Sequence, residues 1–306
     1  MGITKVKVDY KYQHKLNTAK EFEARGKYLH AIQIYYSLIE EFPDYAESYI
    51  NLADIFLLRG KKVSAEEVLK LILDRQPENH EIMLYFAQFL MQSKEWDRAS
   101  EMLSNLSSED PFVSYLTGYC HYKQGDFELA RVFLLRFIIS DEEPELIHEA
   151  YLLLARIEYE LKQFENALKY AKKAEVMYDD HWELYLIFTK IYYHLKMYTH
   201  ASDAILKGIK LDANEAVLFE WAGKINLKMD NFVKARKYFK KHIDLKDQIT
   251  SGDYTYLAEA CLRSGKLDDA LNYYDTAIKL DPQNQLALKG KEKTNNLLNN
   301  RLASDV

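Results

Sequence analysis

The side chains that could do acid–base or metal chemistry are scattered, and their spacing is the first test of an enzymatic function. His148 and Glu149 begin an apolar segment, but Leu152 stands where a zinc-protease helix would place its second histidine. His194 and His200 are six residues apart, a spacing that puts two side chains on different faces of a helix. We find no glycine-rich phosphate loop and no spacing typical of a nucleophile with its base. The sequence therefore predicts a protein that is not an enzyme, with no metal site and no cofactor.

Composition excludes several further classes of protein. Cys120 and Cys261 lie far apart in segments predicted to be helical, which does not indicate a disulfide framework. The net charge of -6 over 306 residues argues against a nucleic-acid partner. No apolar run of 18 residues is present, and the start Met-Gly-Ile-Thr-Lys-Val lacks the apolar core of a signal peptide. We expect a cytoplasmic protein, with a periplasmic or secreted one left open if a leader has been removed.

One stretch of the chain is strongly basic. Residues 224–246 carry eight Lys and Arg side chains against two aspartates. The simpler interpretation is the solvated outer face of a helix, with the lysine stems lying along it. The alternative is a local patch for an anionic partner or a membrane surface.

Alanines recur along the chain at a nearly constant interval. The steps between them are 34, 34, 31, 37, 34, 34 and 35 residues, so that an early deletion is offset by an insertion. A period of 34 predicts a tandem array of helical hairpins, and such arrays act as binding surfaces. The recurring alanines are Ala31, Ala65, Ala99, Ala130, Ala167, Ala201, Ala235 and Ala270.

A second small residue stands twelve positions before each recurring alanine. An apolar residue follows each alanine four positions later, as Leu134 follows Ala130 and Phe239 follows Ala235. Positions three and four apart share a helix face, so a small residue on each helix would let two antiparallel helices approach closely. The small residues are Ala19, Ala53, Ala87, Gly118, Ala155, Thr189, Gly223 and Ala258.

The pattern resembles the tetratricopeptide repeat (TPR) family over residues 12–284. The best stretch is His121-Tyr-Lys-Gln-Gly-Asp-Phe-Glu-Leu-Ala130, and Ile278-Lys-Leu-Asp-Pro282 is similar to the end of a repeat. The resemblance implies an all-α fold, an α-solenoid in which helix hairpins form a right-handed superhelix.

We divide the chain into eight hairpins between a lead-in, residues 1–11, and a capping helix with a tail, residues 285–306. The capping helix would cover the apolar face of the last repeat, with Leu286, Leu288, Leu297 and Leu298 as its docking residues. The insertion at 141–145 is either an ordinary helix start or a hinge between two halves. The hairpins are predicted at 12–45, 46–79, 80–110, 111–144, 148–181, 182–215, 216–249 and 251–284.

The same resemblance implies that the first helix of each hairpin lines a concave groove. At the groove positions, tyrosines gather in the middle repeats and three cations form a row across repeats five to seven. Tyrosine offers a large contact area with a polar tip, and spaced cations suit an acidic or extended segment. The predicted partner-binding residues are Leu84, Tyr115, Tyr119, Tyr122, Leu152, Arg156, Tyr159, Leu186, Lys190, Tyr193 and Lys224.

These observations predict a non-catalytic scaffold or adaptor that binds a protein or peptide partner in the groove. One alternative is an assembly factor for an envelope or secretion machine, working at a membrane surface through the basic seventh repeat. A second alternative is a scaffold that self-assembles into a homo-oligomer.

The helix crossing yields a direct prediction. Replacing Ala167 with leucine overpacks the crossing of its hairpin and should lower the free energy of unfolding by roughly 1–3 kcal/mol. Urea unfolding of the Ala167→Leu variant measures the change, and an unaltered midpoint would show that the register is misassigned.

Overall fold

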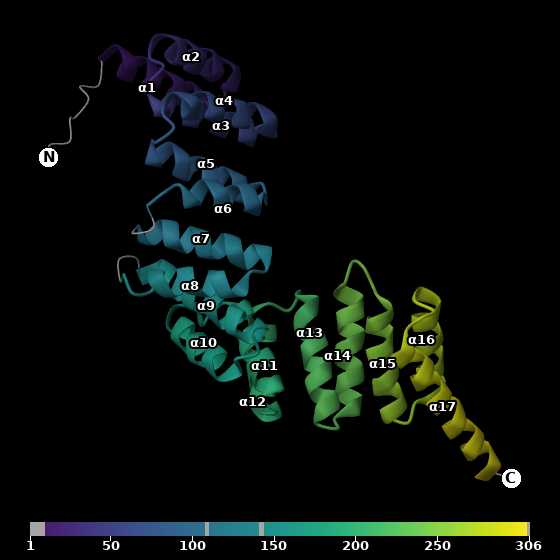
Figure 1. The fold of residues 1–306 in the computed structure, drawn as a ribbon. Helices are drawn as coiled ribbons and strands as arrows, with labels where there is room; N and C mark the ends of the chain where they lie inside the picture. The colour runs from purple at the N-terminus through teal and green to yellow at the C-terminus, as the bar shows by residue number, and fades with distance from the viewer. Residues whose placement is uncertain (1–9, 108–109, 141–143, 305–306) are drawn as a thin grey trace. The chain divides into compact units, whose positions relative to one another are not determined.

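The computed structural model describes residues 10–107, 110–140 and 144–304, and all regular structure in these ranges is α-helical. This confirms the predicted all-α solenoid class. Contacts divide the chain into two units, residues 1–140 with α1–α8 and residues 141–306 with α9–α17 (Figure 1). Most of the predicted lead-in, residues 1–9, and most of the predicted insertion, residues 141–143, lie outside the described residues.

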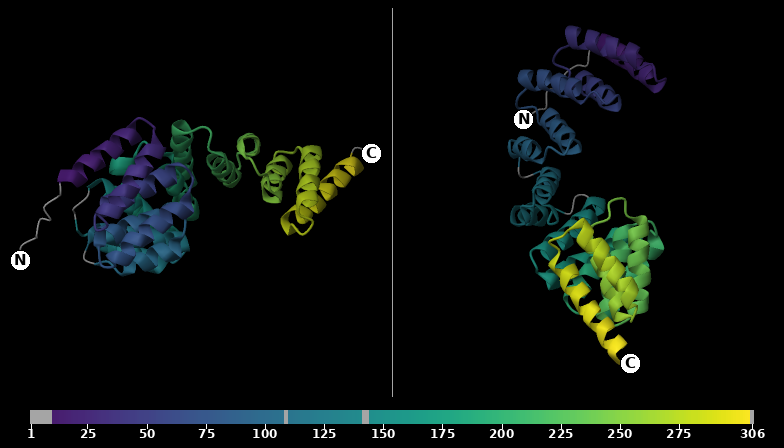
Figure 2. Two further views of the ribbon diagram at one scale, coloured as in Figure 1. Left: turned by 90° about the horizontal axis from the view of Figure 1, so that it is seen from above. Right: turned by 90° about the vertical axis from the view of Figure 1, so that its right-hand side faces the viewer.

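The helices follow one another as antiparallel neighbours within each unit (Figure 1, with two further views in Figure 2). From α1 to α15, each odd-numbered helix makes its most extensive contact with the even-numbered helix that follows it. We assign these pairs to the eight repeats. The helices are α1 Tyr10–Ala24, α2 Tyr28–Glu41, α3 Ala46–Leu58, α4 Lys62–Arg75, α5 His80–Gln92, α6 Trp96–Ser104, α7 Pro111–Gln124, α8 Phe127–Phe137, α9 Pro144–Glu160, α10 Phe164–Tyr178, α11 Trp182–His194, α12 Tyr198–Leu211, α13 Ala216–Lys228, α14 Phe232–Leu245, α15 Ser251–Arg263, α16 Leu267–Leu280 and α17 Gln285–Ser304.

The recurring small residues lie where the two helices of a pair meet. All eight recurring alanines are fully buried. A Cβ atom added to Gly118 would lie 2.8 Å from Leu134 Cγ, and one added to Gly223 would lie 2.5 Å from the Phe239 ring. Each glycine therefore faces the apolar residue of the second helix that the sequence pattern pairs with it. The close approach predicted from the small residues is confirmed at these two crossings.

Each turn inside a pair contains one residue in the left-handed backbone region, five positions before the recurring alanine. A left-handed residue ends a helix by allowing the backbone N–H groups that follow it to bond back to the last carbonyls. Glycine adopts this conformation without strain, whereas a residue with a Cβ atom does so at a cost. Four turns have glycine, at Gly26, Gly60, Gly125 and Gly265, and four have Lys94, Lys162, Lys196 and Asp230.

The C-terminal helix α17 packs on α15 and α16, but not through its leucines. Ala287, Gly290 and Thr294 are buried, and a Cβ atom on Gly290 would lie 2.2 Å from the Tyr274 ring. The predicted docking residues Leu286, Leu288 and Leu297 are exposed, by 71%, 38% and 42%, and Leu298 is half-buried. The prediction was wrong for Leu286, Leu288 and Leu297, because small residues bring this helix close to the Tyr274 ring and these three side chains face away from it.

A buried polar cluster connects α13, α14 and α15. His242 Nε2 lies 2.9 Å from Asp253 Oδ1, and His242 Nδ1 lies 2.9 Å from the carbonyl oxygen of Ala216. The other carboxylate oxygen of Asp253 accepts from Lys246 Nζ at 2.7 Å and from the Thr250 backbone N–H at 2.7 Å. Burial by itself would raise the pKa of Asp253, but the bonds from Lys246, His242 and Thr250 outweigh it and lower that pKa to about 2.

The non-glycine turns give a prediction about stability. The Lys196→Gly variant removes the Cβ strain of a left-handed lysine and should raise the free energy of unfolding by roughly 0.5–1 kcal/mol. The Gly125→Ala variant should lower it. Urea unfolding of the two variants measures both effects, and a loss of stability in Lys196→Gly would contradict the strain argument.

The Asp253 cluster gives a prediction about pH. The pKa of Asp253 is lower in the folded protein than in the unfolded chain, so its contribution is complete above about pH 4 and is lost as the pH falls towards 2. The Asp253→Asn variant should be less stable than the wild type by roughly 2 kcal/mol at pH 7 and nearly equal to it at pH 2.

Hydrogen exchange of the α14 and α15 amides in both proteins measures this difference. A gap between wild type and variant that is constant with pH would show that Asp253 acts through packing and not through its charge.

Candidate partner-binding face

The predicted binding residues are divided between the two units, and we describe the two sets separately. The first unit contains Leu84 on α5 together with Tyr115, Tyr119 and Tyr122 on α7. The second unit contains Leu152, Arg156, Tyr159, Leu186, Lys190, Tyr193 and Lys224, on α9, α11 and α13.

Two of the predicted residues are core residues. Tyr115 is 6% exposed with its ring 5.2 Å from that of Phe137, and Leu152 is 5% exposed within the cluster formed by α9, α10, α11 and α12. A partner cannot reach either side chain in this structure. We therefore remove both from the site, because each side chain packs in the core. Leu84 and Leu186 are half-buried, and Leu186 packs against a core formed by α12 and α13.

Aromatic rings and lysine ammonium groups alternate across α9, α11, α13 and α15 in the second unit. Lys190 Nζ lies 5.9 Å from the ring centroids of both Tyr159 and Trp221. Lys224 Nζ lies 4.9 Å from the Trp221 ring and 5.0 Å from the Tyr256 ring. All four distances fall within the range in which a ring face attracts a cation. We call Tyr159, Lys190, Trp221, Lys224 and Tyr256 the aromatic–lysine ladder.

Aromatic contacts between helices hold the rings of the ladder in place. The Tyr159 ring packs against Phe164 at 5.8 Å and against His194 at 5.4 Å. The Trp221 ring meets the Tyr193 ring edge to face, at 5.3 Å and 82°. Such pairs add about 0.5–1.5 kcal/mol beyond the area they bury, so the ladder exists before any partner binds.

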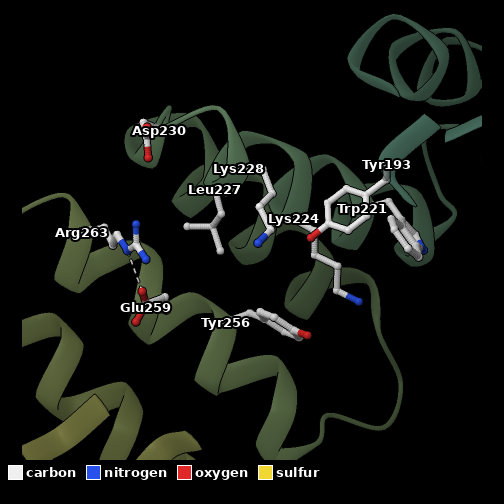
Figure 3. Close-up of a pocket in the computed structure, with 9 residues that line it drawn as sticks. All are labelled: Tyr193, Trp221, Lys224, Leu227, Lys228, Asp230, Tyr256, Glu259 and Arg263. Atoms are coloured by element: carbon white, nitrogen blue, oxygen red, sulfur yellow. Dashed lines mark hydrogen bonds and ion pairs between the residues drawn. The ribbon is translucent and has the colours of Figure 1, made fainter. Parts of the chain in front are cut away.

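The ladder opens into a pocket of about 550 Å³ between α11, α13 and α15 (Figure 3). Tyr193, Trp221 and Tyr256 give it aromatic walls, and the ammonium groups of Lys224 and Lys228 point into the space between them. The remaining lining residues are Leu227, Asp230, Glu259 and Arg263.

The cations of this face differ in how they are compensated. Arg156 pairs with Glu183 at 3.1 Å, and Lys224 pairs with Glu220 at 2.5 Å. In the described part of the chain the contacts of the Lys190 ammonium are with rings, not carboxylates. Burial is the main reason why the pKa of Lys190 is lowered, and it raises the pKa of Tyr159 to about 12. The carboxylates of Glu160 and Glu220 act on the Lys190 ammonium only at longer range.

The ladder depends on the register between successive repeats. Trp221 contacts a lysine 31 residues earlier, and Tyr256 contacts one 32 residues earlier. The first unit repeats this geometry, because the Tyr85 hydroxyl donates to Asp54, again 31 residues earlier. In α5, α13 and α15 one stacked repeat thus brings an aromatic residue onto a charged residue of the preceding first helix.

Trp221 and Tyr256 were missed in the sequence analysis. Trp221 stands three positions before Lys224, and Tyr256 stands three positions before Glu259, so each ring shares a helix face with a charged side chain. A search for aromatic residues three positions before Lys224 or Glu259 would have found them.

Tyr119 and Tyr122 of the first unit meet at a different cation. The ammonium of Lys123 lies 5.2 Å from the Tyr119 ring and 5.8 Å from the Tyr122 ring.

The side chains that the structure describes form no group of histidines, cysteines and carboxylates able to hold a metal ion. No described helix is long and apolar enough to cross a membrane.

Comparison with known proteins identifies the repeats. Family models described as tetratricopeptide repeat match residues 23–79, 64–117, 148–175 and 252–284. DnaJ homolog subfamily C member 3 of Gallus gallus is 22% identical over 307 residues, which covers 94% of this chain and 55% of that protein. A TPR repeat-containing protein of Methanocaldococcus jannaschii is 23% identical over 295 residues, covering 80% of this chain and 52% of that protein. The chain spans about half the length of these relatives.

Solved structures share the fold. The APC/C hetero-tetramer Cut9–Hcn1 superposes with a TM-score of 0.62 at 14% identity, over 92% of this chain and 55% of that one. A tetratricopeptide repeat protein of Parabacteroides merdae gives a TM-score of 0.58 at 16% identity, over 85% and 98%. PilW, described as a type IV pilus biogenesis factor, gives 0.54 at 19% identity, over 66% and 94%. With the repeats, the buried crossings and these matches together, the chain belongs to the tetratricopeptide repeat family.

Proposed function

We propose that the protein is a non-catalytic scaffold that holds a segment of a partner protein along α9, α11, α13 and α15 of its second unit. The observation that carries this proposal is the aromatic–lysine ladder together with the pocket of about 550 Å³ beside Trp221. Solenoid repeats act through such extended surfaces, and family membership supports a role in protein interactions.

The ladder combines two sources of affinity. The half-buried rings of Tyr159, Tyr193 and Trp221 offer apolar area at a low cost in side-chain entropy. The rings also pre-position the lysine ammonium groups, which reduces the ordering that a partner must impose. Burial of apolar surface would supply most of the affinity, at about 25 cal/mol per Å² before the costs of association.

An extended acidic segment fits this face best. The ammonium groups of Lys190 and Lys224 lie on the same Trp221 ring, at 5.9 and 4.9 Å, and Lys228 is exposed beside them. Carboxylates of a bound segment would pair with these cations, while aliphatic or aromatic side chains would cover the ring between them. An extended chain can do both because its successive side chains alternate between two sides.

The proposed site keeps five of the predicted residues and adds two. Leu84, Tyr119 and Tyr122 in the first unit and Leu186 in the second stay predictions, without a specific contact to assign them to this face. The membrane-surface and self-assembly alternatives also stay open, and exposed lysines on α14 such as Lys237 suit the former. The residues of the site are Arg156, Tyr159, Lys190, Tyr193, Trp221, Lys224 and Tyr256.

Peptide display tests this proposal. Random 15-residue peptides displayed on phage are selected on the immobilised full chain, and the enriched sequences are synthesised. We expect acidic peptides whose affinity falls about tenfold or more in Trp221→Leu and several-fold in Lys190→Gln, and weakens with rising salt. Calorimetry of each peptide with each variant measures the change.

The matched control is Lys237→Gln, which removes one lysine from the exposed face of α14 in the same unit. Equal losses in Lys190→Gln and Lys237→Gln would show a general charge effect and contradict the assigned face. Peptides that bind Trp221→Leu as well as the wild type would place the interaction elsewhere. Binding of anionic vesicles that is lost only in Lys237→Gln would support the membrane-surface alternative instead.

A further inference from the structure

Three aromatic rings surround one lysine ammonium in the first unit. Lys123 Nζ lies 5.2 Å from the Tyr119 ring, 5.8 Å from the Tyr122 ring and 6.0 Å from the Trp96 ring. Trp96 begins α6, whereas the other residues lie in the last turns of α7. Three rings that converge on one cation form an aromatic cage, an arrangement known for binding alkylated ammonium groups.

Contacts other than those with the lysine hold the cage open. The Trp96 and Tyr119 rings meet edge to face at 5.9 Å and 63°, and the Tyr122 ring packs against Phe127 at 6.2 Å. Gln124 Nε2 donates to Asp97 Oδ1 at 2.8 Å, which joins the end of α7 to the start of α6. The rings would therefore keep their places if the lysine left.

The Lys123 ammonium is held only weakly in the cage. Its side chain is exposed, and in the described ranges its ammonium contacts rings and not a carboxylate. A primary ammonium is compact and strongly hydrated, so exchanging water for ring faces stabilises it little. A quaternary ammonium sheds its water at lower cost and presents methyl groups to the rings. The same rings should therefore prefer a quaternary ammonium to Lys123.

Room for such a group exists next to the cage. A pocket of about 400 Å³ is lined by Trp96, with Lys94 and Glu95 before it and Asp97, Arg98 and Gln124 also on its wall. Trp96 belongs to both the cage and this pocket. Two carboxylates, Glu95 and Asp97, and two cations, Lys94 and Arg98, line this pocket, and Glu95 pairs with Arg98.

We propose that Trp96, Tyr119 and Tyr122 form a binding site for a quaternary ammonium group, which displaces the Lys123 side chain. A trimethylated lysine of a partner protein and a choline group share this chemistry. The site lies in the first unit and does not depend on the aromatic–lysine ladder of the second, so either proposal can fail alone.

Fluorine NMR of the full chain labelled with 5-fluorotryptophan tests the site, because Trp96, Trp182 and Trp221 give one resonance each. The probes are Nα-acetyl-trimethyllysine amide, Nα-acetyl-lysine amide and choline. We expect the trimethylated probe to shift the Trp96 resonance alone and to bind about tenfold more tightly than the unmethylated one. Sedimentation with phosphatidylcholine vesicles distinguishes a lipid source from a protein source of the ammonium group.

Two variants make the result decisive. Lys123→Met removes the competing cation and should tighten binding about two- to fivefold, and Tyr122→Leu should weaken it by a similar factor. Lys224→Met, which removes the cation beside Trp221, is the matched control and should leave the Trp96 titration unchanged. The proposal is overturned if the Trp96 resonance stays still in both the wild type and Lys123→Met, or if the unmethylated probe binds equally well.

Discussion

The close approach of the two helices in each hairpin is the constraint on which the other contacts of this protein depend. Gly223 shows how tight it is, because a single added Cβ atom would overlap the Phe239 ring. An interior packed at crystal-like density transmits such a constraint, since neither helix can rotate without creating a void or a clash. Fixing the pair fixes which residues of its first helix face the next repeat. The spacing of 31 residues between Lys190 and Trp221 follows from that geometry.

The sequence was enough to predict the helical architecture because the signal recurs with every repeat. Eight alanines in one register leave little room for another fold, and the left-handed turn residues follow the same steps of 34, 34, 31, 37, 34, 34 and 35. The step of 31 corresponds to α6, which has 9 residues where α2 and α4 have 14. A shortened second helix keeps its crossing with α5, since the crossing lies near its start at Ala99.

The candidate site was harder to predict because it depends on contacts between repeats, which no periodicity within one repeat contains. The row of Arg156, Lys190 and Lys224 was visible in the sequence, but its chemistry depends on neighbours from other helices. Glu183 neutralises the first cation, Glu220 pairs with the last, and only the middle one meets rings alone among the described contacts. The prediction of the docking residues of α17 was wrong for a related reason. Leucine is the usual docking residue, yet Gly290 brings the backbone so close to Tyr274 that the leucines lie outside.

Lysine and aromatic residues are combined in both units, but with opposite consequences for binding. In the second unit each ladder lysine lies between two rings, but Lys224 also pairs with Glu220. Lys190 is half-buried and meets rings alone among the described contacts, and it is the cation that we propose an acidic segment binds. In the first unit Lys123 is exposed, and three rings face its single ammonium group. This is the cation that we propose a quaternary ammonium group displaces. On the two proposals together, the second unit holds an acidic segment and the first unit an alkylated ammonium group.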